Sequence, residues 1–151
     1  MTGYRGHDIE AEIAGLEICV ARNIRFVDGM ASSIALGVQR AAELDPDGIM
    51  IMLADMPMLD AVDLDTLIDA FRKGGAKTIV RAACEGVPGN PVIFPRSAFG
   101  GLQGLNDDRG ARQLISQLPL DVINVEIGIA AKIDIDTAEQ LASFGGQLEA
   151  Y

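Results

Sequence analysis

A carboxylate stands at the end of the most apolar stretch of this 151-residue chain. Residues 49–54 are Ile, Met, Ile, Met, Leu and Ala, and Asp55, Met56 and Pro57 follow them. An unbroken apolar run between Gly48 and Pro57 predicts a central strand buried on both faces of a parallel sheet. Open α/β sheets bind their ligands at the carboxyl ends of such strands. Asp55 is therefore a candidate ligand for a hard cation such as Mg²⁺, with the N-cap of the next helix as the alternative.

A second group of carboxylates lies near the C-terminus. Asp134 and Asp136 alternate with an isoleucine at the end of a predicted strand over residues 132–135, so both would point to the same side. Both could meet Asp55 at a metal ion. The alternative is a capping box, in which Asp136 or Thr137 binds the first amides of the last helix.

A third candidate is the start of a predicted helix over residues 30–44, where Gly29 and Met30 precede Ser32 and Ser33. Glycine allows a ligand to approach closely, and the hydroxyls and free amides of a helix N-terminus can bind a polar or anionic ligand. In the alternative interpretation, Ser32 or Ser33 only caps the helix.

A fourth candidate combines a glycine-proline loop with a charged segment. The loop contains Gly89, Asn90 and Pro91, and the charged segment contains Arg109 and Arg112. A guanidinium group matches the geometry of phosphate oxygens, so the two arginines are plausible phosphate contacts. Taken alone, each arginine is more often an ordinary surface charge on a helix.

Alternating strands and helices must position these candidates. Strands are predicted over residues 16–20, 49–53, 77–83, 90–94, 121–125 and 132–135, and helices over 6–14, 30–44, 59–71, 96–104, 109–117 and 137–144. This alternation predicts an α/β fold with a parallel or mostly parallel sheet. The length suits a single domain over residues 1–151.

Composition narrows the classes of partner. The net charge is -10 without a basic cluster, which argues against nucleic acid. The N-terminus lacks a signal-peptide pattern, and no apolar segment is long enough to predict a membrane span. Cys19 and Cys84 have no metal-type spacing, so we predict buried, reduced thiols in a cytoplasmic protein. His7, the one histidine, is predicted to be a surface residue.

Five segments taken together resemble one family. They are GMASS at 29–33, LADMP at 53–57, GNPVIFP at 89–95, DRGAR at 108–112 and DIDT at 134–137. The chain resembles the MobA-like nucleotidyltransferases, and among them it is most similar to the molybdenum cofactor cytidylyltransferases. The resemblance covers essentially the whole chain. It implies a three-layer α/β/α, Rossmann-like fold with a mostly parallel sheet, of the nucleotide-diphospho-sugar transferase type.

The resemblance also implies an activity: Mg²⁺-dependent transfer of CMP from CTP to a phosphorylated molybdopterin-type cofactor, with release of pyrophosphate. A molybdoenzyme client would receive the product. Asp55 and Arg109 are the implied catalytic residues. At the metal, the resemblance implies Asp55 with Asp136, or with Asp134 as an alternate. The nucleotide would contact Gly29, Met30, Ser32 and Ser33. The acceptor would contact Gly89, Asn90 and Pro91, beside Arg109.

Two departures from the family pattern matter. Asn90 stands where the family usually has histidine. The family's opening loop, of the form Leu-Ala-Ala-Gly-x-Ser-x-Arg-Met-Gly, is not found. Thr2, Gly3 and Tyr4 resemble the residues just after the family's second strand, so an opening unit of roughly 30 residues or more is expected to be lacking.

Three explanations of this truncation stay open: a misassigned gene start, a C-terminal fragment, or a short chain that forms a homo-oligomer through an exposed sheet edge. Two other functions also stay open. The chain could be a truncated, catalytically inactive paralogue that acts as a binding protein. It could also be a nucleotidyltransferase that acts on a sugar or alcohol phosphate.

Overall fold

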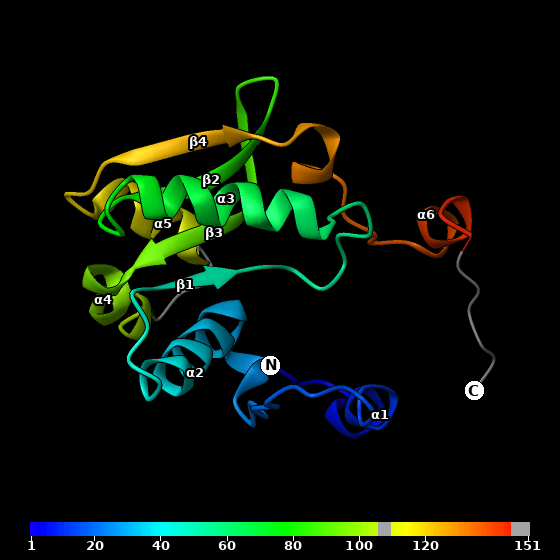
Figure 1. The fold of residues 1–151 in the computed structure, drawn as a ribbon. Helices are drawn as coiled ribbons and strands as arrows, with labels where there is room; N and C mark the ends of the chain where they lie inside the picture. The colour runs from blue at the N-terminus through cyan, green and yellow to red at the C-terminus, as the bar shows by residue number, and fades with distance from the viewer. Residues whose placement is uncertain (106–109, 146–151) are drawn as a thin grey trace. The chain divides into compact units, whose positions relative to one another are not determined.

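The computed structural model describes residues 1–105 and 110–145, with the backbone alone for 110–113. The strands are β1 (Gly48–Ile51), β2 (Ile79–Cys84), β3 (Val87–Pro95) and β4 (Val122–Glu126). The α-helices are α1 (Gly6–Glu12), α2 (Met30–Ala42), α3 (Ala61–Lys73), α4 (Phe99–Gln103), α5 (Gly110–Gln117) and α6 (Ala138–Ser143). Short 3-10 helices are η1 (Phe26–Asp28), η2 (Arg96–Ala98) and η3 (Gly128–Ala131). Figure 1 shows the path of the chain.

The chain divides into two compact units, each considered by itself below. The first unit comprises Met1–Ile49 and Pro95–Leu120. The second comprises Met50–Phe94 and Asp121–Tyr151.

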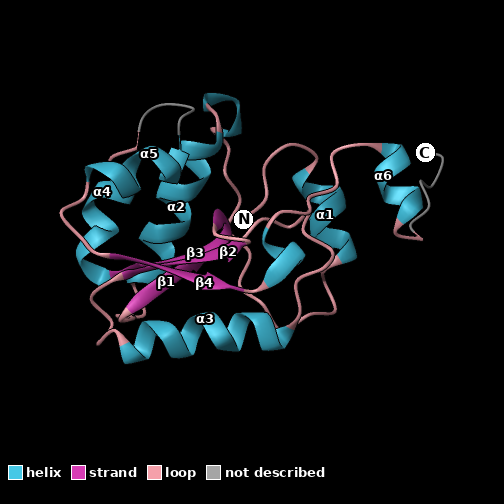
Figure 2. Ribbon diagram, turned by 90° about the horizontal axis from the view of Figure 1, so that it is seen from above, coloured by secondary structure: helices cyan, strands magenta, loops and turns pink. Residues whose placement is uncertain are grey.

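The second unit is built on a mixed sheet. The strand order is β1-β3-β2-β4, with β2 antiparallel to β3 and parallel to β4. Helix α3 lies along one face of this sheet (Figure 2). Its Leu67 and Phe71 pack against Val80, Ala82 and Ile93 in one buried cluster. The predicted α/β, Rossmann-like fold class is confirmed, and the predicted pair of strands joined by a loop is the antiparallel β2–β3 hairpin.

Helix α3 begins at a reciprocal pair of carboxylates. Asp60 Oδ1 accepts a hydrogen bond from the Asp63 amide at 2.9 Å, and Asp63 Oδ2 accepts one from the Asp60 amide at 3.3 Å. This capping box satisfies two amides that the helix itself cannot pair. Asp60 rather than Asp55 is thus the helix N-cap, and the capping alternative for Asp55 is excluded.

In the first unit, α2 packs against α4 and α5. The buried side chains include Ala31 and Val38 of α2 and Leu102 of α4. Gly101 permits a close helix contact, because a Cβ there would lie 3.0 Å from Leu114 Cδ1. Gly101 therefore allows α4 and α5 to approach each other closely.

The predicted strand over residues 16–20 is wrong. These residues form no strand, and Leu16, Ile18 and Val20 are exposed. The apolar alternation was real, but a strand needs a neighbour for its backbone groups. Cys19 is exposed in this segment, which corrects its predicted burial, whereas Cys84 is buried as expected; both thiols are free.

Two other strand predictions need correction. Residues 132–135 follow η3 and form no strand. The last strand of the described sheet is β4, which ends at Glu126. The expected central strand over 49–53 is the four-residue β1, which lies at the sheet edge and is half-buried rather than buried on both faces. With β3 as its one neighbour in the described sheet, β1 does not lie at the centre.

None of the helices in the described residues is both long enough and apolar enough to span a membrane.

Candidate functional site

Helix α2 of the first unit is preceded by Gly29, whose backbone has φ 89° and ψ 177°. This conformation strongly favours glycine, because a Cβ would be strained there. The Ser32 hydroxyl lies 2.8 Å from the Gly29 carbonyl oxygen and 3.0 Å from that of Arg25. Gly29 is the N-cap, and within the described part of the chain no side-chain hydrogen bond caps this end, so the capping alternative for Ser32 and Ser33 is excluded.

A buried asparagine organises the same loop. The Asn23 side chain, 4% exposed, donates to Ser32 Oγ at 2.8 Å and to Ser33 Oγ at 2.9 Å. Its Oδ1 accepts from the Arg25 amide at 2.9 Å. Sequence reasoning missed Asn23, although it follows the apolar run 16–20 much as Asp55 follows the run 49–54. One side chain therefore holds both serine hydroxyls at the start of α2.

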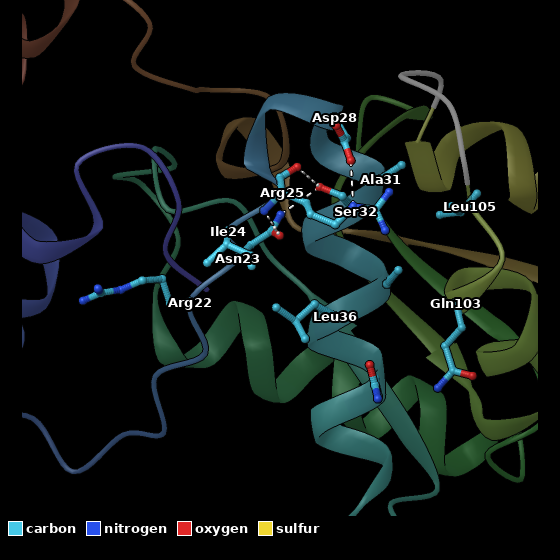
Figure 3. A pocket seen from close by; sticks show the side chains of 12 residues that line it. Arg22, Asn23, Ile24, Arg25, Asp28, Ala31, Ser32, Leu36, Gln103 and Leu105 are labelled. Atoms are coloured by element: carbon cyan, nitrogen blue, oxygen red, sulfur yellow. Dashed lines mark hydrogen bonds and ion pairs between the residues drawn. The ribbon is translucent and has the colours of Figure 1, made fainter.

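A cavity of about 780 Å³ adjoins this loop (Figure 3). This volume is in the range of roughly 300–1,000 Å³ that is typical of small-molecule sites. Figure 3 shows the labelled side chains of Asn23 and Ser32 facing each other at the start of α2. The cavity combines apolar, amide, hydroxyl and charged groups. Its lining is Arg22, Asn23, Ile24, Arg25, Asp28, Ala31, Ser32, Ala35, Leu36, Gln39, Gln103 and Leu105.

Two arginines of this lining are already ion-paired. Arg25 Nε lies 2.7 Å from Asp28 Oδ2. Arg22 forms a bidentate pair with Glu10 and also contacts the exposed ring of His7, the histidine that was predicted to lie at the surface. Hydrogen bonds to Glu10, mainly from Arg22 and to a lesser extent from Thr2, lower the pKa of Glu10 to about 2. The hydrogen bond between Arg22 and Glu10 also raises the pKa of Arg22.

In the second unit, Asp55 lies in an exposed turn after β1. The Ile135 amide donates a hydrogen bond to the carbonyl oxygen of Asp55 at 2.9 Å, which places the segment of Asp134 and Asp136 beside this turn. All three carboxylates are in exposed residues. Helix α6 is capped by Thr137 with Gln140, so the capping box exists without the side chain of Asp136.

The carboxylates are available for a cation but do not form a closed metal site. In the part of the chain that the structure describes, no group of three or more His, Cys, Asp or Glu residues is placed to hold a metal ion. Among the same residues, the carboxylates of Asp55, Asp134 and Asp136 have no hydrogen bond or ion pair. Mg²⁺ takes one or two protein carboxylates and completes its shell with phosphate oxygens and water, so these residues fit such an ion.

The predicted glycine-proline loop is a bulge in β3. Arg81 pairs with Val92 and Ala83 pairs with Pro88, so the three residues Gly89, Asn90 and Pro91 lie opposite Ala82 alone. A bulge re-aims side chains and is common near active sites. The Asn90–Pro91 peptide bond is cis. Arg109, the remaining predicted site residue, lies outside the described residues, as does the side chain of Arg112.

The mixed sheet and its helices are consistent with a Rossmann-like α/β fold of the nucleotide-diphospho-sugar transferase type. Residues 2–122 match the MobA-like NTP transferase domain, and the chain belongs to this family.

A curated protein is similar to part of this chain. Over 114 residues the chain is 31% identical to the purine catabolism protein PucB of Bacillus subtilis (strain 168). The match covers 74% of this chain and 54% of PucB. The chain thus spans about half the length of this relative.

Solved structures show the same fold. The crystal structure of Rv0371c from Mycobacterium tuberculosis H37Rv is 24% identical with a TM-score of 0.74, covering 94% of this chain and 72% of that one. Rv0371c complexed with manganese has a TM-score of 0.69 at 24% identity and covers 93% and 73%. Molybdopterin-guanine dinucleotide biosynthesis protein A from Archaeoglobus fulgidus is 14% identical with a TM-score of 0.63, covering 91% and 71%.

Proposed function

We propose that this chain carries a nucleotidyltransferase site that transfers CMP from CTP to a phosphorylated molybdopterin-type cofactor and requires Mg²⁺. The main observation is the hydrogen bond from Ile135 to the Asp55 carbonyl, which brings the Asp134 and Asp136 segment to the turn of Asp55. Membership of the MobA-like family supports the reaction class. The name of the Archaeoglobus neighbour supports a molybdopterin-type acceptor.

The reaction needs positioning and charge neutralisation. A phosphate oxygen of the acceptor attacks the α-phosphorus of CTP, the bond to the β-phosphate oxygen breaks, and pyrophosphate leaves. The attacking phosphate is already ionised, so the site needs no general base. Most of the catalytic effect then comes from orientation and electrostatic stabilisation.

Asp55 and Asp136, with Asp134 as the alternate, would hold Mg²⁺ against the phosphates. The ion would neutralise charge that develops on the phosphate oxygens. The manganese complex of Rv0371c supports a divalent cation in this fold. Mg²⁺ itself is our proposal for this chain.

The nucleotide would bind at the start of α2, with Gly29, Met30, Ser32 and Ser33 as its contacts. Asn23 holds the two serine hydroxyls in place for this contact. The acceptor would bind at the bulge of Gly89, Asn90 and Pro91, with Arg109 as its phosphate contact. The product would pass to a molybdoenzyme client. The free thiols of Cys19 and Cys84 suit the reducing cytoplasm, where we place the protein.

Binding of nucleoside triphosphates tests this proposal directly. CTP, GTP and ATP are each titrated by calorimetry with and without Mg²⁺, on wild type, Asp55→Ala and Asp65→Ala. Asp65 is an exposed carboxylate of α3 and serves as the matched control. We expect saturable CTP binding that needs Mg²⁺, is lost in Asp55→Ala and persists in Asp65→Ala.

The other outcomes are informative. CTP binding that changes neither with Mg²⁺ nor in Asp55→Ala would favour a binding protein without activity. If no triphosphate binds, the proposal is overturned for this chain. If CTP binds but CMP is transferred only to a sugar or alcohol phosphate, the acceptor assignment is wrong.

We also propose that β1 associates with a second copy of the chain. It is an edge strand of the described sheet, and unpaired strand edges promote pairing between chains. Met52, just after β1, is 51% exposed, and Met58, in the turn before α3, is 42% exposed. Sedimentation should show self-association that Met52→Lys weakens and Met58→Lys does not. A wild-type monomer at all concentrations would contradict this.

A further inference from the structure

A single charged side chain interrupts the otherwise apolar strand β2. Arg81 is half-buried, whereas the other five residues of the strand are buried. Placing a guanidinium group among such neighbours is unfavourable unless its donors find acceptors. The Arg81 guanidinium therefore needs hydrogen-bond acceptors close to the strand.

Arg81 bonds to the bulge of the neighbouring strand. Its Nε donates to the Gly89 carbonyl oxygen at 3.1 Å. Because a peptide group is planar, fixing this carbonyl also fixes the orientation of the amide that leads into Asn90. Arg81 thus acts on the backbone from which the Asn90 side chain extends.

Gly89 is held from a second side by η3. A Cβ at Gly89 would lie 2.0 Å from the carbonyl oxygen of Ala131, so the two backbones are in direct contact. Gly89 is therefore in contact with both the Ala131 backbone and the Arg81 guanidinium. Such a double restraint on one peptide is a means of pre-organising the residue that follows it.

Asn90 has the features of a ligand contact. It is half-buried, and in the described part of the chain no hydrogen bond of its side-chain amide is found. A carboxamide can both donate and accept, so it can bind a polar group of a ligand. The Asn90 carboxamide can bind such a group well only if it points in a fixed direction. The restrained Gly89 peptide helps to fix that direction.

We propose that Arg81 is a positioning residue for the acceptor substrate: it restrains the Gly89 carbonyl and so aims the Asn90 carboxamide at the acceptor. The proposal rests on the proposed function in one respect, that the bulge of Gly89, Asn90 and Pro91 binds the acceptor. Arg81 itself acts through Asn90.

Kinetics separates positioning from a general structural role. Arg81→Met should raise KM for molybdopterin about tenfold, the size expected for loss of one well-placed hydrogen bond, with KM for CTP unchanged. Arg81→Lys should give an intermediate KM, because lysine keeps the charge but lacks the planar fork. Arg72→Met is the control, since Arg72 is exposed on α3 and pairs with Asp69. Equal changes in both KM values would overturn the proposal.

A double-mutant cycle tests the route through Asn90. Asn90→Ala should raise KM for molybdopterin as Arg81→Met does, and the double variant should be no worse than Asn90→Ala alone. Additive effects would show that Arg81 acts independently of Asn90, contrary to the proposal. If Arg81→Met does not fold, the cycle is run with Arg81→Lys.

Nuclear magnetic resonance gives a readout that needs no turnover. The Asn90 side-chain NH₂ resonances, assigned from an Asn90→Asp variant, should move in Arg81→Met and stay in place in Arg72→Met. Molybdopterin should shift them in wild type and less so in Arg81→Met. Unchanged Asn90 resonances in Arg81→Met would overturn the inference. If wild type transfers no CMP while these resonances respond as expected, the proposed reaction fails and the positioning role stands.

Discussion

The backbone amide of Ile135 donates to the carbonyl oxygen of Asp55, and this one hydrogen bond joins the turn after β1 to the segment before α6. Its consequence is that Asp55 and the carboxylates on either side of Ile135 belong to one local structure. The segment of Asp134 and Asp136 thus lies beside the turn of Asp55, and none of the three carboxylates has an ion-pair partner among the described residues. Carboxylates of this kind suit a divalent cation that is shared with phosphate oxygens.

The first prediction concerns these carboxylates. Asp55→Asn should lower kcat/KM by about 100-fold or more, because it weakens binding of the Mg²⁺ that would neutralise developing phosphate charge, and loss of one such stabilising interaction has effects of this size. The Asp136→Asn and Asp134→Asn variants, measured at several Mg²⁺ concentrations, identify the second ligand: the true one should need more Mg²⁺ for half-maximal rate. Asp65→Asn is the control. Equal rates for Asp55→Asn and wild type would remove Asp55 from the site.

The second prediction concerns Asn23. Asn23→Ala leaves two serine hydroxyls and the Arg25 amide without this partner inside the protein. Losing a buried hydrogen-bonding partner costs about 1–3 kcal/mol, so urea unfolding should show a loss in this range. KM for CTP should rise as well. Asn124→Ala, at an exposed position of β4, should stay within about 0.5 kcal/mol of wild type. A stable Asn23→Ala variant with normal CTP binding would disprove the assigned role.

The third prediction concerns two glycines, one packed against another backbone segment and one with open space around it. Gly89→Ala places a Cβ against the Ala131 carbonyl and should destabilise the protein at the upper end of the roughly 1–3 kcal/mol seen for overpacking. Gly100→Ala, in α4 with no atom within 4 Å of its new Cβ, should be neutral or stabilising by up to about 1 kcal/mol. Thermal unfolding of both variants gives the comparison. Similar melting temperatures would mean that the Gly89 contact is absent in solution.

The fourth prediction is a titration. The pKa of Glu10 is about 2 in the folded protein, below its usual 4.5, because Arg22 and Thr2 donate hydrogen bonds to the ionised carboxylate. A depressed pKa means that this stabilisation is complete above pH 4.5 and is lost as the pH falls toward 2. The ¹³C resonance of the Glu10 carboxyl should titrate near pH 2.

Two variants test the cause of that shift. Arg22→Gln removes the larger contribution and should move the Glu10 midpoint most of the way back to its usual value, whereas Thr2→Val should move it less. A wild-type midpoint near 4.5 would show that the ion pair does not form in solution. The free energy of unfolding should follow the same order, with Arg22→Gln losing the stability advantage that wild type has above pH 4.5.

Sequence patterns predicted the elements that carry a local signal. The helix over residues 30–44, the helix over 59–71 and the strand over 90–94 correspond to α2, α3 and β3 within a few residues. Apolar spacing and terminal residues act within one element, so they can be recognised without its neighbours. The family segments likewise allowed the fold class to be recognised before any contact was known.

Strand predictions failed where pairing decides the outcome. Residues 16–20 and 132–135 have alternating apolar side chains, yet they form no strand, because a strand needs a neighbour to satisfy its backbone. The same dependence on neighbours explains why β1 is half-buried at a sheet edge rather than buried at the centre.

In the candidate site, too, residue types and positions were predictable from the sequence, whereas contacts between elements were not. The amino-acid sequence was enough to propose Asp55, Ser32, Ser33, Asn90 and Asp136 as candidates, because residue type and position relative to an apolar run, a helix start or a glycine-proline loop are local properties. The tertiary structure was needed to show that Asn23 holds both serines and that Arg81 reaches the bulge. These are contacts between residues on different elements or turns. Such contacts depend on how the elements pack, which no local pattern encodes.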